Sequence, residues 1–102
     1  MAAEYLEKKG FTLLERNFNT RRGEIDLILS KDQVIHFVEV KYRKDLSWGH
    51  PAEAITPEKL RRIQRTADFY LYQRGLSGVQ WQIDVIGIVG EKIQWIPAVS
   101  LM

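Results

Sequence analysis

The sequence has 102 residues, of which 45% are hydrophobic and 11% aromatic, and this predicts one globular domain over residues 1–102. It contains no cysteine, which excludes disulfide bonds, thiolate metal sites and thiol nucleophiles and suits the reducing cytoplasm. The net charge of +2 permits a nucleic-acid partner, and no apolar run approaches the roughly 20 residues of a membrane span. We therefore expect a cytoplasmic domain that does not associate with membranes.

The first half of the chain predicts a helix, a strand and a β-hairpin. Residues 2–9 carry apolar side chains at helical spacing, which predicts a helix that ends at Gly10, and the pattern of residues 11–18 predicts a strand. Residues 22–44 contain two apolar, β-branched runs separated by the polar residues 30–33. Two such runs with a short polar break are typical of a hairpin.

The second half predicts a capped helix followed by two strands. Thr56 suits the N-cap position, Pro57 suits the first helical turn, and Gly75 ends the helix. Residues 79–89 and 93–96 have the composition of strands. The resulting order α-β-β-β-α-β-β predicts an α/β fold, with a central mixed β-sheet flanked by helices.

Alternation along the hairpin brings four charged side chains onto one face. We place Leu29 opposite Val34, and successive side chains of a strand point to opposite faces. One face then receives Ile25, Leu27, Leu29, Val34, His36, Val38 and Val40. The other face receives Glu24, Asp26, Ile28, Ile35, Phe37, Glu39 and Lys41. Charges among apolar neighbours predict a sheet covered on both sides, where a buried charge must be paired or metal-bound.

The charged face has the composition of a metal site. Asp26 and Glu39 offer carboxylate oxygens, which Mg²⁺ or Mn²⁺ binds together with waters and substrate phosphate. Lys41 would lie about 6–7 Å from Glu39 along the same face, where it could position an attacking water and stabilise developing charge. Glu24 could complete a second metal position or hold a metal-bound water. The structural alternative is a salt bridge of Lys41 with Glu39 or Asp26.

Basic side chains are predicted around these charges, near the ends of the hairpin strands and on the helix that starts at Pro57. They are Arg22, Arg43, Lys44, Lys59, Arg61, Arg62 and Arg65. A positive rim around a negative centre suits the phosphate backbone of DNA. For the helix residues the alternative is an ordinary solvated face. Trp48 could stack on an unpaired base, although packing over the hairpin edge is the simpler interpretation.

Two polar residues within predicted strands receive structural interpretations. His36 falls on the apolar face, so we expect a hydrogen-bonded core histidine. Asp84 lies in an alternating strand, so we expect it at an edge or on the surface. Because the chain has two histidines and no cysteine, we do not expect a zinc site at His50.

Three segments taken together resemble the YraN family of bacterial proteins. They are Gly23-Glu24-Ile25-Asp26-Leu27-Ile28, Phe37-Val38-Glu39-Val40-Lys41, and residues 49–57 (Gly-His-Pro-Ala-Glu-Ala-Ile-Thr-Pro) with Lys59. That family is similar to the PD-(D/E)xK nuclease superfamily, which includes archaeal Holliday-junction resolvases. The resemblance covers nearly the whole chain. Ile25 stands where the superfamily has Pro, and the acidic residue that many relatives carry upstream of Glu4 is absent because this chain starts after it.

The resemblance implies a restriction-endonuclease-like core and an Mg²⁺- or Mn²⁺-dependent endonuclease that hydrolyses DNA phosphodiester bonds, at branched or damaged DNA. Asp26, Glu39 and Lys41 would be catalytic, and Glu24 would join the two carboxylates in holding metal. Two alternatives stay open: a non-catalytic nucleic-acid-binding module of the same fold, and a structural or protein-interaction domain. A homodimer through the apolar segment 93–102 would suit cleavage of two strands.

Overall fold

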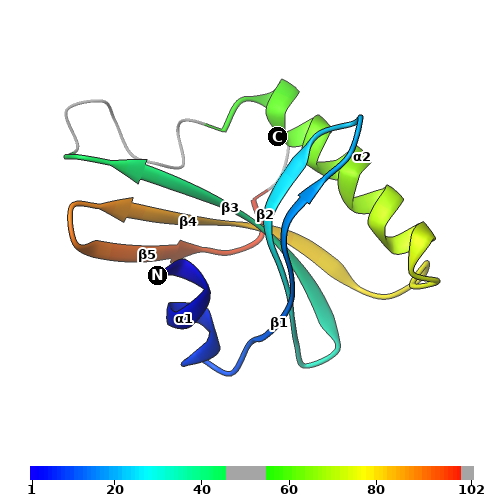
Figure 1. Ribbon diagram of the computed structural model, residues 1–102, viewed down its shortest axis with the longest axis horizontal. Helices are drawn as coiled ribbons and strands as arrows, with labels where there is room; N and C mark the ends of the chain where they lie inside the picture. Colours follow the sequence, from blue (N-terminus) through cyan, green and yellow to red (C-terminus); the bar gives the residue numbers. More distant parts are fainter. Residues whose placement is uncertain (46–54, 100–102) are drawn as a thin grey trace.

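The computed structural model describes residues 1–45 and 55–99, in which five strands and two helices follow one another in the predicted order (Figure 1). The helices are α1 (Ala2–Glu7) and α2 (Pro57–Gln73). The strands are β1 (Thr12–Asn19), β2 (Glu24–Lys31), β3 (Val34–Arg43), β4 (Trp81–Val89) and β5 (Lys92–Ile96). The predicted α/β class is confirmed. Trp48, His50 and the last residues of the predicted interface segment, 100–102, lie outside the described residues.

The strands form one mixed sheet whose spatial order is the chain order, β1-β2-β3-β4-β5. The pairs β1–β2, β2–β3 and β4–β5 are antiparallel, whereas β3 and β4 are parallel. Adjacent parallel strands need a crossover of a dozen or more residues, because the chain must return to the starting edge. The segment that contains α2 makes this crossover, which places α2 against the strands that carry the predicted site.

The two helices lie against opposite faces of the sheet (Figure 1). The face under α2 is closed by a cluster of Ile25, Ile28, Ile35, Phe37, Leu60, Ile63, Ala67, Tyr70, Leu71 and Ile83. The face under α1 is closed by Ala2, Ala3, Leu6, Phe11, Leu27, Leu29, Val38, Ile86 and Ile88. The sheet is therefore covered on both sides, as the apolar neighbours of the hairpin charges predicted.

The hairpin register differs from the prediction by two residues. Val34 pairs with Lys31, and Leu29 pairs with His36. A shift of two residues leaves every side chain on its predicted face, since the side-chain period of a strand is two. Ile25 is the exception, because it belongs to the cluster under α2. The β2–β3 pairing begins at Leu27, and the regular alternation of faces does not extend back to Ile25.

The predicted signals at the start and end of α2 are confirmed. The Thr56 hydroxyl accepts a hydrogen bond from the backbone N–H of Lys59 at 3.1 Å, and Pro57 is the first helical residue. Such a cap satisfies one of the N–H groups that a helix leaves without an internal partner. At the other end Gly75 adopts φ +67°, which favours glycine. No helix among the described residues is long and apolar enough to cross a membrane.

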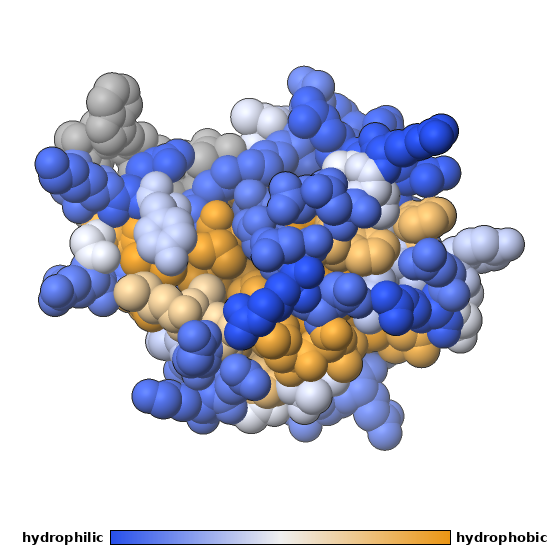
Figure 2. Space-filling view, in the orientation of Figure 1, coloured by the Kyte–Doolittle hydropathy of each residue, from blue (hydrophilic) through white to orange (hydrophobic). Residues whose placement is uncertain are grey.

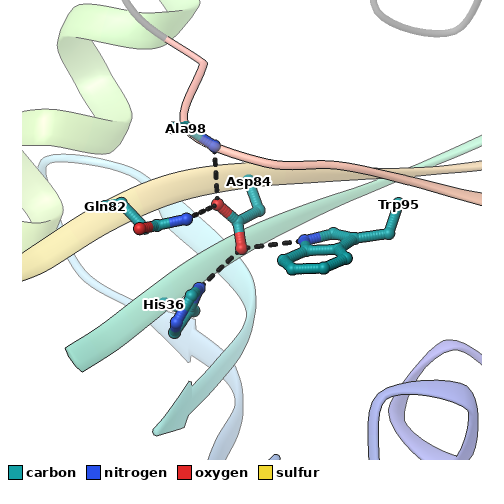
Figure 3. Close-up of polar contacts among 5 residues, drawn as sticks. All are labelled: His36, Gln82, Asp84, Trp95 and Ala98. Atoms are coloured by element: carbon teal, nitrogen blue, oxygen red, sulfur yellow. Dashed lines mark hydrogen bonds and ion pairs between the residues drawn. The ribbon is translucent and has the colours of Figure 1, made fainter. Parts of the chain in front are cut away.

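Asp84 corrects the sequence interpretation, because it is fully buried rather than at an edge or on the surface. Its carboxylate lies 2.7 Å from Nδ1 of His36 and accepts hydrogen bonds from Gln82 Nε2 (2.8 Å), Trp95 Nε1 (3.0 Å) and the backbone N–H of Ala98 (2.9 Å) (Figure 3). These partners come from β3, β4, β5 and the segment after β5. His36 is the hydrogen-bonded core histidine that its position predicted.

Candidate functional site

A cavity of about 190 Å³ lies where β2, β3 and α2 meet. Its lining residues are Gly23, Glu24, Asp26, Glu39, Lys59, Arg62 and Ile63. Two strands of the hairpin supply the carboxylates, and α2 supplies two cations. Asp26 and Glu39, which were predicted to be neighbours, thus share one cavity, and Glu24 lies with them.

A hydrogen bond between strands fixes Asp26 beside Glu39. The Asp26 Oδ2 atom accepts a hydrogen bond from the backbone N–H of Val40 at 2.8 Å. Asp26 lies near the start of β2, before the regular pairing with β3 begins at Leu27. The Val40 N–H thus donates to a side-chain oxygen, where in a regular sheet it would donate to a main-chain carbonyl of the paired strand. The bond ties Asp26 to the residue that follows Glu39, so the two carboxylates are held by the backbone of both strands.

Glu39 is the buried anion of the site, with 8% of its surface exposed. Its Oε1 atom lies 2.9 Å from Nζ of Lys59 and 3.3 Å from Nζ of Lys41. The alternation of β3 explains the approach of Lys41, and the N-terminus of α2 brings Lys59. The salt bridge between Lys41 and Glu39 that the structural alternative predicted is present, and a second lysine joins it.

Burial and like charge both act on Asp26. Its pKa is raised from the ordinary value, first by burial and then by the carboxylates of Glu39 and Glu24, while the Val40 N–H and Lys59 act in the opposite direction. Burial also lowers the pKa of Lys41, and the neighbouring Lys59 lowers it further against the opposing effect of Glu39. The carboxylates of the cavity therefore repel one another, and an additional cation between them would relieve that repulsion.

The residues present fit a hard divalent cation. Carboxylate oxygens are the ligands that Mg²⁺ and Mn²⁺ prefer, and Mg²⁺ usually keeps several waters and takes one or two protein carboxylates. A cavity of about 190 Å³ is larger than the roughly 30 Å³ that one water occupies in the liquid. Within residues 1–45 and 55–99 no three Asp, Glu, His or Cys side chains gather closely enough to hold a metal by themselves. Glu24 lines the cavity and remains a prediction as a ligand.

The predicted basic residues lie in two separate places, on and beside α2 and at the far end of β3. Lys59 and Arg62 line the cavity, and the Arg22 guanidinium stacks on the ring of Phe69 of α2 at 4.9 Å. Arg61 and Arg65 are exposed on α2, where Figure 2 shows a mostly hydrophilic surface. At the far end of β3, Arg43 donates to the backbone oxygen of Tyr42, and Lys44 lines a separate depression with Gly87 and Lys92.

Known proteins match most of this chain. The family described as "Uncharacterised protein family UPF0102" matches residues 1–88. The chain belongs to the UPF0102 family. Relatives called UPF0102 protein are 45% identical over 91 residues in Syntrophomonas wolfei and 44% identical over 92 residues in Persephonella marina. These alignments cover 89% and 90% of this chain and 79% of each relative. A UPF0102 protein of Vibrio parahaemolyticus is 42% identical, over 94% of the chain and 82% of the relative.

Membership of UPF0102, a YraN-like family, confirms the family part of the resemblance. The sequence did not predict the direct contact of Lys59 with Glu39 in this UPF0102 chain, because Lys59 was assigned to the basic rim and to a segment of the resemblance without a contact to Glu39. One signal was available. Lys59 is the third residue of α2, where a capping box has Glu or Gln.

Proposed function

We propose that this UPF0102 chain is an Mg²⁺- or Mn²⁺-dependent nuclease with a restriction-endonuclease-like core, which hydrolyses phosphodiester bonds of DNA. The observation that carries the proposal is one cavity containing Asp26 and Glu39, in which burial and like charge raise the pKa of Asp26 and a lysine pair contacts Glu39. The mixed sheet flanked by helices supports the proposed core.

Asp26 and Glu39 would hold the cation through their carboxylate oxygens, with Glu24 beside them. When bound, the cation supplies Lewis-acid polarisation of the phosphate and lowers the pKa of water. Lys41 extends from β3 on the same face as Glu39, and its ammonium orients the attacking water and stabilises the charge that develops on the phosphate oxygens. It needs no deprotonation for this role.

The cations of α2 would hold the DNA backbone. Arg62 lines the cavity, and its guanidinium lies 2.9 Å from the exposed carboxylate of Glu58, a pair that solvent weakens. Arg22 is held over Phe69 at the turn before β2. Contacts of this kind position a phosphate chain without reading its sequence. We therefore propose a structural preference, for branched or damaged DNA, in place of a sequence preference.

A cleavage assay tests the proposal. The purified protein is incubated with Mn²⁺ and end-labelled linear, single-stranded and four-way junction DNA, beside the double variant Glu39→Gln, Lys41→Ala. We expect products from the parent protein and none from the variant. Cleavage of no substrate, or cleavage by the variant at the parent rate, would contradict the proposal. Salt-dependent DNA binding without product, unchanged in Asp26→Asn, would favour a non-catalytic binding module.

A further inference from the structure

Lys59 supplies a positive charge directly to Glu39, one of the two carboxylates proposed to hold the metal. Its ammonium lies 2.9 Å from Oε1, closer than the 3.3 Å of Lys41, and Lys59 itself lines the cavity beside Asp26. Glu39 is a buried carboxylate, and a buried charge without a partner is costly. The two lysines supply the positive charge that this carboxylate needs.

Helix stability does not explain a lysine at this position. A cation in the first turn of a helix faces the positive end of the helix dipole, whereas the acidic Glu58 beside it is favourable there. The third helical residue is also where a glutamate would complete a capping box with Thr56. The cap instead fixes the backbone of Lys59 through the 3.1 Å bond from its N–H to Thr56, and the side chain reaches Glu39.

The two lysines differ in how readily they could leave Glu39. Lys41 projects from the middle of the sheet two residues after Glu39, and 19% of its side chain is exposed. Lys59 comes from another element, and 35% of its side chain is exposed. A lysine has a flexible four-carbon stem, so its charge can move while its backbone stays capped. Lys59 is therefore the cation that can exchange its partner.

We propose that the Lys59 ammonium substitutes for the divalent cation on Glu39 in the metal-free protein, and that metal entry displaces it to a phosphate of the bound DNA. The inference rests on the proposed function for the identity of the metal and the substrate. It adds a competition: the metal and Lys59 bind the same carboxylate oxygen, so each weakens the binding of the other.

Calorimetric titration with Mn²⁺ tests the competition without requiring DNA cleavage. We expect Lys59→Met and Lys59→Gln to bind Mn²⁺ about two- to fivefold more tightly than the parent, as loss of a partly exposed competing ion pair would produce. The matched control is Arg62→Met, which removes a charge from the same cavity but leaves the Glu39 contacts in place. Melting curves identify any variant that has lost its fold.

Each outcome of the titration has a defined meaning. Tighter binding in both Lys59 variants and not in Arg62→Met supports direct competition, whether or not the protein cuts DNA. An equal gain in Arg62→Met would overturn it, because a general loss of positive charge would then explain the effect. Unchanged or weaker binding in the Lys59 variants would also overturn it. Mn²⁺ binding by none of the proteins would contradict both this inference and the proposed metal dependence.

A salt series with DNA tests the second part, the transfer of Lys59 to a phosphate. Without metal, Lys59 stays on Glu39, so we expect parent and Lys59→Met to show the same dependence of DNA affinity on salt. With Mn²⁺ present, and with Lys41→Ala in both proteins to suppress cleavage, we expect the slope of log affinity against log salt to be smaller in the protein that also carries Lys59→Met by about 1. An equal slope difference with and without Mn²⁺ would identify an ordinary phosphate contact and overturn the transfer.

Discussion

The two faces of the sheet carry carboxylates in different electrostatic surroundings. On the face under α1, Asp84 is fully buried, and its two oxygens receive four contacts from the described part of the chain (Figure 3). On the face under α2, Asp26 and Glu39 line a cavity, and the pKa of Asp26 is raised by burial and by its acidic neighbours. A satisfied carboxylate stabilises the fold, whereas carboxylates that repel one another in a cavity indicate a binding site.

The largest expected effect is on the structural side of this comparison. Asp84→Ala would remove the acceptor of one buried contact, from His36, and of three part-buried contacts, from Gln82, Trp95 and Ala98. We expect it to lower the free energy of unfolding by about 3–5 kcal/mol. Urea unfolding followed by circular dichroism measures it.

The matched control is Glu91→Ala, an exposed carboxylate in the turn after β4, which we expect to stay within about 0.5 kcal/mol of the parent. Equal stability of Asp84→Ala and Glu91→Ala would remove the distinction between the two carboxylate sites.

On the face under α2, the matching variant is Lys41→Ala, which removes an ammonium that contacts Glu39. If its ammonium stabilises charge on the scissile phosphate, its loss should slow cleavage by about 10²–10³-fold. Single-turnover cleavage of junction DNA with saturating Mn²⁺ measures the rate, and Lys8→Ala, an exposed lysine after α1, provides the control. A Lys41→Ala protein as fast as Lys8→Ala would assign Lys41 to structure alone.

The pH dependence of stability separates a functional from a structural Asp26. Because the folded-state pKa of Asp26 is raised, its ionised form opposes folding above that pKa, and this cost disappears at acid pH where both states are protonated. Asp26→Asn removes the charge and keeps an oxygen for the Val40 N–H. We expect the variant to melt at a higher temperature than the parent at pH 7.

This advantage should shrink as the pH falls through the folded-state pKa and vanish below 3.8, the ordinary aspartate value. A thermal melting series from pH 7 to pH 3 measures it. If Asp26→Asn is less stable than the parent at pH 7, Asp26 belongs to a stabilising salt-bridge network, as the structural alternative states.

The smallest expected effect concerns the basic residues of α2. Arg61 and Arg62 are both exposed, but only Arg62 is among the described residues that line the cavity. We expect Arg62→Gln to reduce the slope of log DNA affinity against log salt by about 1 and Arg61→Gln to leave it nearly unchanged. Fluorescence anisotropy with labelled DNA measures both. A larger reduction of the slope in Arg61→Gln than in Arg62→Gln would place the DNA on the outer face of α2.

The sequence predicted the charged face correctly because strand alternation survives a two-residue error in register. Placing Leu29 opposite Val34 was wrong, yet Asp26, Glu39 and Lys41 still fell on one side. The prediction was wrong for Ile25, because it assumed regular alternation in the residues before Leu27. In that part of β2 the strand is not regularly paired with β3, and the Asp26 side chain accepts a hydrogen bond from Val40 instead.

Contacts between distant segments could not be derived from local patterns. Asp84 was assigned to an edge because alternating polar residues are usually exposed, but its partner His36 lies 48 residues earlier, and Trp95 and Ala98 follow on and after β5. Lys59 reaches Glu39 across the crossover to α2. Its departure from the capping-box pattern was a local sign of that contact.

The central claim is that Asp26 and Glu39 form a divalent-metal site, and crystals soaked in Mn²⁺ test it most directly. We expect an anomalous scattering peak in the cavity beside α2, about 2.0–2.2 Å from a carboxylate oxygen of each residue, as for hard divalent cations in proteins. We also expect this peak to be lost in crystals of Glu39→Gln. A protein that crystallises with the Lys59–Glu39 contact intact and shows no Mn²⁺ peak in this cavity would contradict the account.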